Sequence, residues 1–152
     1  MNQLKILNSK ETKEIFKLIE EQWNAKLKVN QAFLKNNKNR IFIVNKDISK
    51  IDLSKLRVNS IGMYFCEIDK LGIRLSIEGS QIVGPLASKN VAEISEEQEK
   101  QWLKGEDLEI KGNYSDFIII KHNNDFLGSG KYILDGRILN YVSKSRRITS
   151  AL

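Results

Sequence analysis

The fold is decided by a stretch in the second half of the chain, Ile94-Ser95-Glu96-Glu97-Gln98-Glu99-Lys100-Gln101-Trp102-Leu103-Lys104-Gly105. Ser95 and Gln98 have the spacing of a capping box, in which each side chain bonds to the backbone N–H of the other residue at a helix start. Trp102 supplies an apolar contact for that helix, and Gly105 is placed to end it in the left-handed conformation. The stretch therefore predicts one short helix.

Short strands are expected on both sides of this helix. Apolar or alternating runs place them at residues 91–94, 108–110, 117–120, 126–132 and 137–142. Turn residues separate the last three strands, at His122-Asn123-Asn124-Asp125 and at Asp135-Gly136. One helix within a set of short strands predicts a small, partly open barrel.

The first half of the chain has a helix followed by strands. The helix is expected to begin near Ser9 as its N-cap, with an apolar face formed by Ile15, Leu18, Ile19, Trp23 and Leu27. Strands are expected at residues 41–44, 60–68 and 73–77, with weaker helical signals at 47–56. A turn at Glu78-Gly79-Ser80 would then lead the third strand into residues 81–83.

Gly84-Pro85, which contains the only proline, is the best candidate for a boundary between the two halves. We therefore predict an α+β protein in which a domain at residues 1–85 packs on a β-rich domain at residues 86–152. The length of 152 residues and the hydrophobic content of 41% suit either two small units packed together or one compact unit.

The single cysteine, Cys66, excludes an intramolecular disulfide and is interpreted as a small core residue in a reducing compartment. No segment approaches the roughly 20 apolar residues that cross a bilayer. The first residues lack the basic-then-apolar order of a signal peptide. We expect a cytoplasmic protein that has no membrane partner.

The charge distribution favours a polyanionic partner. The formal net charge is +6, and basic side chains that neutralise phosphates release condensed counterions. Residues 86–125 hold five basic and nine acidic side chains, whereas residues 126–152 hold five basic and one acidic. The charge alone is also compatible with a solvated lysine-rich surface, so the location of the basic residues is the more informative observation.

A basic cluster near the C-terminus is the sharpest functional feature of the sequence. Arg137, Lys144, Arg146 and Arg147 fall within eleven residues. Arginine gives planar, bidentate contacts to phosphate, and lysine gives a mobile point charge. The apolar residues of the last strand should anchor the start of the cluster, and an anchored cluster loses less entropy on binding. The alternative is a disordered or merely solvated basic terminus.

Few residues could support catalysis. His122 lies at an expected hairpin tip, where a solvated turn residue is the simpler interpretation, and it is not expected to pair with Cys66 as a nucleophile and base. The segment Gly128-Ser129-Gly130-Lys131 lacks the spacing of a phosphate-binding loop and falls in an expected strand. The sequence predicts no catalytic residue, no metal site and no cofactor. An enzyme with an unrecognised site remains an alternative.

Taken as an ordered set, three segments of the second half resemble a PUA domain, the module named after pseudouridine synthases and archaeosine transglycosylases. They are the helix that ends before Gly105, the strand Phe126-Leu127-Gly128-Ser129-Gly130-Lys131, and the end Leu139-Asn140-Tyr141-Val142-Ser143-Lys144-Ser145-Arg146-Arg147-Ile148. The likeness covers about residues 86–150. It is greatest to the version in Sun-family RNA cytosine methyltransferases and related archaeal proteins.

The first half looks like the pre-PUA domain that precedes PUA modules in small archaeal and eukaryotic proteins, among them a nucleolar factor for large-subunit ribosome assembly. The sequence holds no methyltransferase domain, no cofactor-binding Gly-rich turn and no catalytic cysteine motif. The resemblance therefore implies RNA binding without the chemistry of the methyltransferases.

The resemblance implies a pseudo-barrel that grips structured RNA between its helix and the neighbouring strands. By position it implies RNA contacts at Lys89, Lys104, Gly105, Lys131, Arg137, Asn140, Lys144, Arg146 and Arg147. The expected function is non-catalytic binding of ribosomal or transfer RNA in ribosome biogenesis or RNA modification. The alternative is a protein–protein adaptor for a separate RNA-modifying enzyme or a ribosome-assembly complex.

Overall fold

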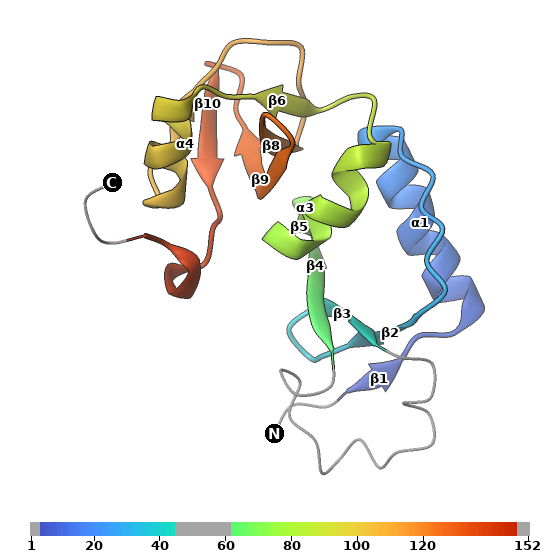
Figure 1. Ribbon diagram of the computed structural model, residues 1–152. Helices are drawn as coiled ribbons and strands as arrows, with labels where there is room; N and C mark the ends of the chain where they lie inside the picture. Colours follow the sequence, from blue (N-terminus) through green and yellow to red (C-terminus); the bar gives the residue numbers. More distant parts are fainter. Residues whose placement is uncertain (1–3, 45–61, 149–152) are drawn as a thin grey trace.

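The structure is a computed structural model that describes residues 4–44 and 62–148 (Figure 1). These residues form three α-helices and ten strands in two five-stranded sheets, which confirms the α+β class. The helical turns expected at residues 47–56 and the start of the strand expected at 60–68 lie outside the described residues.

The first sheet is an antiparallel array in chain order. It consists of β1 (Lys5–Ile6), β2 (Ala32–Lys35), β3 (Arg40–Val44), β4 (Met63–Asp69) and β5 (Gly72–Leu75). Helix α1 (Ser9–Trp23) connects β1 to β2, and its N-cap is Asn8 rather than Ser9 as predicted. The Asn8 side chain accepts a hydrogen bond from the Glu11 backbone at 2.9 Å, and the Glu11 carboxylate accepts one from the Asn8 backbone at 3.1 Å. The N-cap therefore stands one residue earlier than expected, and it forms a complete capping box with Glu11.

The strand and turn predicted across residues 76–83 are wrong. β5 ends at Leu75, and helix α3 (Ile77–Val83) follows with Ser76 as its N-cap. The Ser76 hydroxyl accepts a hydrogen bond from the Gly79 backbone at 2.9 Å. Gly79 lies against β4, where an added Cβ would come within 2.1 Å of the Phe65 carbonyl oxygen. A short 3₁₀ helix, η3 (Gly84–Leu86), follows at the expected boundary.

The second sheet curls into a half-barrel beside α4 (Figure 1). Its strand order is β6 (Val91–Glu93), β8 (Phe117–His122), β9 (Asp125–Tyr132), β10 (Arg137–Asn140) and β7 (Leu108–Glu109). β6 and β8 are parallel, and the other pairs are antiparallel. These strands confirm the predicted set, with two main differences. β8 runs on to His122, which was expected in the turn, and the last strand ends at Asn140 instead of Val142.

Helix α4 (Glu96–Leu103) has the predicted ends. The Ser95 hydroxyl accepts a hydrogen bond from the Gln98 backbone at 3.1 Å, and the Gln98 side chain accepts one from the Ser95 backbone at 2.9 Å. Gly105 has a φ of 93°, the left-handed conformation expected after a helix end. The Trp102 side chain is fully buried, and its indole nitrogen donates to the Leu127 carbonyl at 2.7 Å. These contacts fix the helix on the half-barrel.

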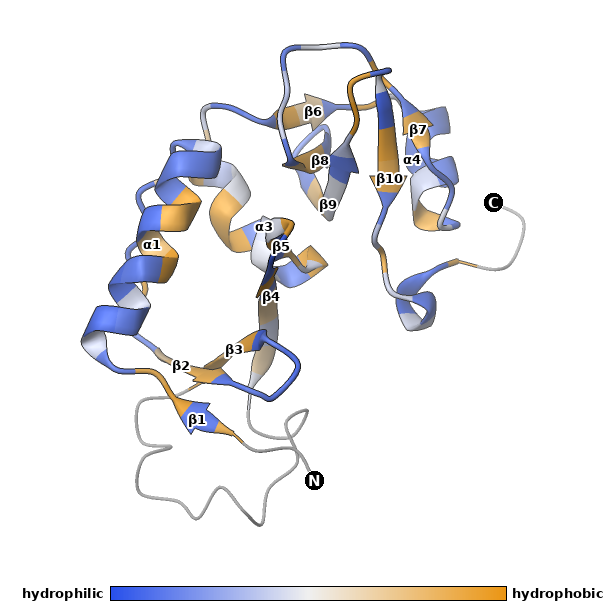
Figure 2. Cartoon of the chain, turned by 180° about the vertical axis from the view of Figure 1, so that it is seen from behind, coloured by the Kyte–Doolittle hydropathy of each residue, from blue (hydrophilic) through white to orange (hydrophobic). Residues whose placement is uncertain are grey.

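The two halves share a continuous core. Apolar side chains of α1, among them Ile19 and Trp23, pack in one cluster with Phe117 and Ile119 of β8. The apolar face of α1 accordingly lies on the inner side of the molecule (Figure 2). The Gln22 side chain donates to the backbone carbonyl of Phe117 at 2.7 Å. The core therefore continues across the expected boundary at residues 84–85.

Helix α3 and strand β5 form hydrogen bonds to β9 in the second half of the chain. The Ser80 hydroxyl accepts a hydrogen bond from the Gly128 backbone at 2.8 Å, and the Ser129 hydroxyl donates to the Leu75 carbonyl at 2.9 Å. Ser80 and Ser129 are both buried. These bonds hold α3 and β5 against β9, and so they set the position of the first sheet relative to the half-barrel.

Candidate nucleic-acid interface

The segment after β10 packs against the C-terminal end of α4. It contains the 3₁₀ helix η4 (Lys144–Arg146). The Ile148 backbone donates to the Leu103 carbonyl at 2.8 Å, and the Arg147 Nε donates to the Val142 carbonyl at 3.0 Å. The Arg147 side chain also covers Gly105, where an added Cβ would lie 2.5 Å from the Arg147 Nε. The basic C-terminal cluster is therefore held on the helix through residue 148.

Asn140 fastens the end of β10 to the end of α4. Its side-chain amide donates to the carbonyls of Trp102 at 2.8 Å and Glu106 at 3.0 Å. Its side-chain oxygen accepts a hydrogen bond from the Val142 backbone at 2.8 Å. This bond turns the backbone away from the strand ladder, which is why β10 is shorter than predicted.

Four cationic side chains surround this junction, and we call them the basic rim: Lys104, Lys144, Arg146 and Arg147. Lys104 and Lys144 are exposed, and Arg147 is half-buried. The Arg146 guanidinium forms an ion pair with Glu78 of α3 and keeps 47% of its side-chain surface exposed. Among the described residues, no ion pair joins the rim to the carboxylates of α4. The rim is therefore available to an anionic ligand.

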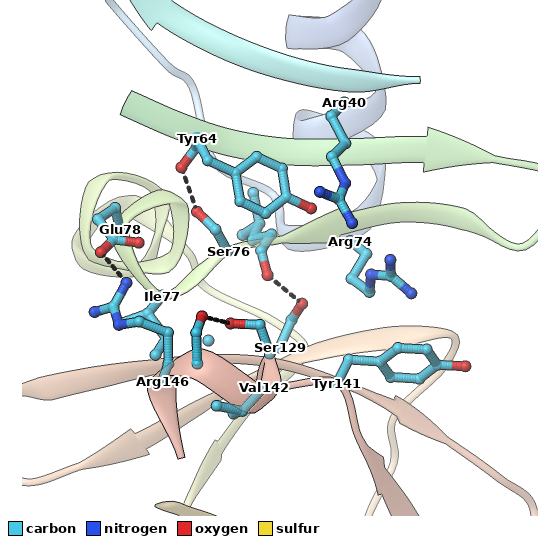
Figure 3. Close-up of a pocket in the computed structure, with 14 residues that line it drawn as sticks. Arg40, Tyr64, Arg74, Ser76, Ile77, Glu78, Ser129, Tyr141, Val142 and Arg146 are labelled. Atoms are coloured by element: carbon cyan, nitrogen blue, oxygen red, sulfur yellow. Dashed lines mark hydrogen bonds and ion pairs between the residues drawn. The ribbon is translucent and has the colours of Figure 1, made fainter. Parts of the chain in front are cut away.

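A cleft of about 380 Å³ lies next to the rim, between the two halves of the molecule (Figure 3). The first half contributes side chains from β3, β4, β5 and α3, and the second half contributes β9 and the segment after β10. The polar and aromatic residues that line it are Arg40, Tyr64, Arg74, Ser76, Glu78, Ser129, Tyr141, Ser143, Ser145 and Arg146. Arg146 thus belongs both to the rim and to the cleft.

One carboxylate positions two arginines on the cleft wall. Arg40, Glu67 and Arg74 are cross-strand neighbours on β3, β4 and β5. Glu67 accepts a hydrogen bond from the Arg40 Nε at 3.3 Å and one from an Arg74 terminal nitrogen at 2.8 Å. A register shift in the β3–β4 pairing accompanies the burial of two consecutive residues, Phe65 and Cys66. Such a bulge re-aims side chains, so that Tyr64 and Glu67 face the same side of the sheet.

Cations and aromatic rings alternate from this wall to the second sheet. The Arg74 guanidinium lies 4.5 Å from the centroid of the Tyr141 ring, and Tyr141 meets Phe117 edge to face at 5.4 Å. The Lys131 ammonium lies 5.2 Å from the Phe117 ring centroid. Burial raises the pKa of the Tyr64 phenol, and the positive charge of Arg74 opposes this shift. Phe117 is buried, so the partly exposed Arg74 and Tyr141 are the members of this row suited to holding a nucleic-acid strand by charge and by stacking.

Residues 89–148 match the family model described as the methyltransferase RsmF PUA domain. The chain contains a PUA domain. The resemblance to the Sun-family methyltransferase module is thereby confirmed, and the domain supports RNA binding in general. The matched segment does not reach the residues that resemble a pre-PUA domain. A search of curated proteins found no match to the chain.

The PUA domain brings together six of the nine residues expected to contact RNA. They meet where α4 ends and η4 begins, and they are Lys104, Gly105, Asn140, Lys144, Arg146 and Arg147. Asn140 and Gly105 make contacts within the protein that shape the rim, so a direct RNA contact for either stays a prediction.

The other three expected residues lie elsewhere in the PUA domain. Lys89 is exposed just before β6, the edge strand opposite β7. Lys131 pairs with Asp116 at 3.0 Å and points toward the Phe117 ring. Arg137 begins β10, at the end of the strand away from the rim, and pairs with Asp135 at 3.0 Å. These three do not join the basic rim, and their role in RNA binding stays a prediction.

Sequence reasoning missed the cleft residues Arg40, Tyr64 and Arg74, which lie outside the PUA domain. The alternation of Arg74 between buried Ile73 and Leu75 does indicate an outward-facing side chain. It does not indicate that this side chain meets Tyr141 of the other half. That contact depends on how α3 packs against β9.

Cys66 and His122, the two residues considered as a catalytic pair, lie on different strands and do not line the cleft. Cys66 is buried in the shared core, and burial raises the pKa of its thiol. His122 ends β8, and a hydrogen bond from its ring Nδ1 to the Ile94 carbonyl at 2.8 Å raises its pKa. Within residues 4–44 and 62–148, no three His, Cys, Asp or Glu side chains gather as metal ligands. Nor is any helix in these ranges long and apolar enough to cross a membrane.

Proposed function

We propose that the chain is a non-catalytic RNA-binding protein that recognises folded ribosomal or transfer RNA through the basic rim of its PUA domain. The attachment of the rim to α4 by the bonds of Asn140 and Ile148, together with the bond of Arg147 to Val142, supports this proposal. Basic side chains held in place lose less conformational freedom on binding than a mobile terminus does. Phosphate contacts of this kind fix the position of RNA without reading its sequence.

The charges of α4 set the direction in which RNA can approach. Glu96, Glu97 and Glu99 occupy the first turn, where they also interact favourably with the helix dipole. The helix has eight residues and is therefore about 12 Å long. The basic rim lies at its other end. A ribose-phosphate surface is attracted to the rim and repelled by the first turn, so we expect the RNA to lie over the junction of α4 and η4.

The salt dependence of RNA binding tests this proposal. The double variant Lys104→Ala, Lys144→Ala removes two exposed cations from the rim, and Lys10→Ala, Lys13→Ala removes two exposed cations near the start of α1. Fluorescence anisotropy with labelled transfer RNA or a ribosomal RNA fragment, repeated across a salt series, would compare both with the parent protein.

We expect the rim variant to bind more weakly and to flatten the plot of log affinity against log salt by about one to two units of slope. The α1 variant, which loses the same charge, should keep the parent slope. Equal effects of the two variants would show that net charge, and not the rim, determines binding.

The proposed process is ribosome biogenesis or RNA modification in the cytoplasm. The matched family is the PUA domain of a methyltransferase, so an RNA-modifying enzyme that acts with this chain is a fitting partner. Crosslinking the protein to cellular RNA and sequencing the bound fragments would identify the RNA. A partner that stays bound after nuclease treatment, with no RNA affinity in the purified protein, would favour an adaptor role instead.

A further inference from the structure

We propose that the cleft between the two halves receives one unpaired nucleotide of the RNA that the PUA domain binds. Its base would stack among Tyr64, Arg74 and Tyr141. The phosphates on its two sides would face Arg146 and Arg40, which lie at opposite ends of the cleft (Figure 3). This inference rests on the proposed RNA-binding function. It adds a second, base-holding site that uses residues of the first half of the chain.

The size of the cleft suits a single nucleotide. Its volume of about 380 Å³ falls at the lower end of the range of small-molecule sites, roughly 300–1,000 Å³. Proteins that recognise an RNA sequence bind unpaired bases that have left the base stack, and they place these bases against aromatic side chains or guanidinium planes. Tyr64, Arg74 and Tyr141 offer both kinds of surface, and each of the three is partly exposed.

The charges of the cleft suit a phosphate group. Arg40 and Arg74 of β3 and β5 line one end of the cleft, and Arg146 of η4 lines the other (Figure 3). The carboxylates that pair with them are Glu67 and Glu78. Three positive charges against two negative ones leave a net positive charge. Each guanidinium has five N–H donors, and the ion pairs use only part of this capacity. The carboxylates therefore hold the arginines in place while further donors remain for an anion.

Because the cleft adjoins the rim, RNA that is bound at the rim can extend into the cleft. Arg146 stands at the border between the rim and the cleft, and the neighbouring hydroxyls of Ser143 and Ser145 also line the cleft. A strand whose backbone follows the rim can place the next unpaired nucleotide between Arg146 and Tyr141 without crossing the acidic first turn of α4. A duplex is too wide for this cleft and would contact the rim alone.

Two RNA hairpins test the inference. One has a single bulged uridine, and the other has the same stem with the uridine deleted. Affinities of both hairpins, measured by fluorescence anisotropy, would be compared for the parent protein and for Tyr141→Leu, which removes the aromatic ring and keeps an apolar side chain. Arg40→Gln is a second cleft variant. The Arg40 side chain is 49% exposed, so its replacement should not disturb core packing. Lys104→Ala, Lys144→Ala serves as the matched rim variant.

We expect the parent protein to prefer the bulged hairpin. Tyr141→Leu should bind that hairpin about tenfold more weakly, because a base loses its stacking surface, and should bind the paired hairpin as before. Arg40→Gln should reduce the same preference. The rim variant should weaken both hairpins equally and keep the preference.

The possible failures are distinguishable. If the parent protein binds neither hairpin, the proposed function fails and this inference fails with it. If the parent protein binds both hairpins equally, or if both cleft variants keep the preference, only the inference is overturned. Binding of free uridine monophosphate without any preference for the bulge would assign the cleft to a free nucleotide and would also overturn it.

Discussion

Replacing Asn140 with alanine removes three hydrogen bonds that fasten the end of β10 to the end of α4. The lost partners are the carbonyls of Trp102 and Glu106 and the backbone N–H of Val142. A hydrogen bond contributes about 0.5–1.5 kcal/mol net, and the bonds to Trp102 and Val142 are partly buried, so the total loss should be roughly 2–3 kcal/mol. For a urea m-value near 2 kcal/mol/M, the unfolding midpoint should fall by about 1–1.5 M.

Urea denaturation followed by tryptophan fluorescence measures this loss directly. Asn140→Asp is the matched variant, because it keeps an acceptor for Val142 but turns a carboxylate toward two carbonyls and lies close to Asp107. It should lose at least as much stability as the alanine variant. Without urea, the RNA affinity of the folded alanine variant should fall only modestly, because the bonds of Arg147 and Ile148 still hold the rim. A stability within about 0.5 kcal/mol of the parent, together with weaker RNA binding, would refute the structural role and favour direct contact of Asn140 with RNA.

Three further predictions concern the core and the titratable residues. Gly130→Ala should destabilise the fold by about 1–3 kcal/mol in the same assay, because the new Cβ would lie 2.6 Å from a methyl group of Ile138. A variant as stable as the parent would contradict this. Cys66 should not react with a thiol reagent until the protein unfolds, since burial raises the pKa of its thiol, and rapid labelling without denaturant would show a more open core. His122 should titrate above the ordinary histidine pKa when followed by NMR, chiefly because of its hydrogen bond to the Ile94 carbonyl. The stability that the protonated ring gains from this bond is present below the ordinary pKa and is lost as the pH rises through the raised one. A pKa at or below the ordinary value would contradict the expected shift.

Helix α4 could be predicted from the sequence because all of its signals are local. The capping box of Ser95 and Gln98 and the glycine at position 105 act within a few residues of the helix ends. The apolar run at residues 117–120 was equally clear, since a fully buried strand needs no alternation. These elements define the half-barrel on which the basic rim stands.

Helix α3 could not be predicted in the same way. Ile73, Leu75 and Ile77 alternate with polar residues, as they would in a continuing strand. The chain leaves that pattern at Ser76, whose hydroxyl caps the helix and also donates to the Tyr64 carbonyl at 2.6 Å. Gly79 then packs against the backbone of β4. Both contacts are with residues more than ten positions away, so no local pattern reports them.

The basic rim of the candidate site could be predicted from the sequence, and the cleft could not. Three of the four rim residues, Lys144, Arg146 and Arg147, lie close together near the C-terminus, and the resemblance to a PUA domain joined them to Lys104. The cleft needs a β-bulge that turns Tyr64 and Glu67 to one side, and it needs the packing of α3 on β9 that brings Arg74 to Tyr141. Neither condition follows from hydrophobic periodicity, because a bulge interrupts the very alternation from which faces are assigned.

Backbone amide chemical shifts of the isotope-labelled protein, recorded as the bulged hairpin is added, locate the RNA most directly. The largest changes should fall at residues 103–106 and 143–147, with a second group around Arg74 and Tyr141. The helix α1 and the acidic first turn of α4 should stay unchanged. Changes concentrated on α1 or on that first turn, with the rim unaffected, would contradict RNA binding at the junction of α4 and η4.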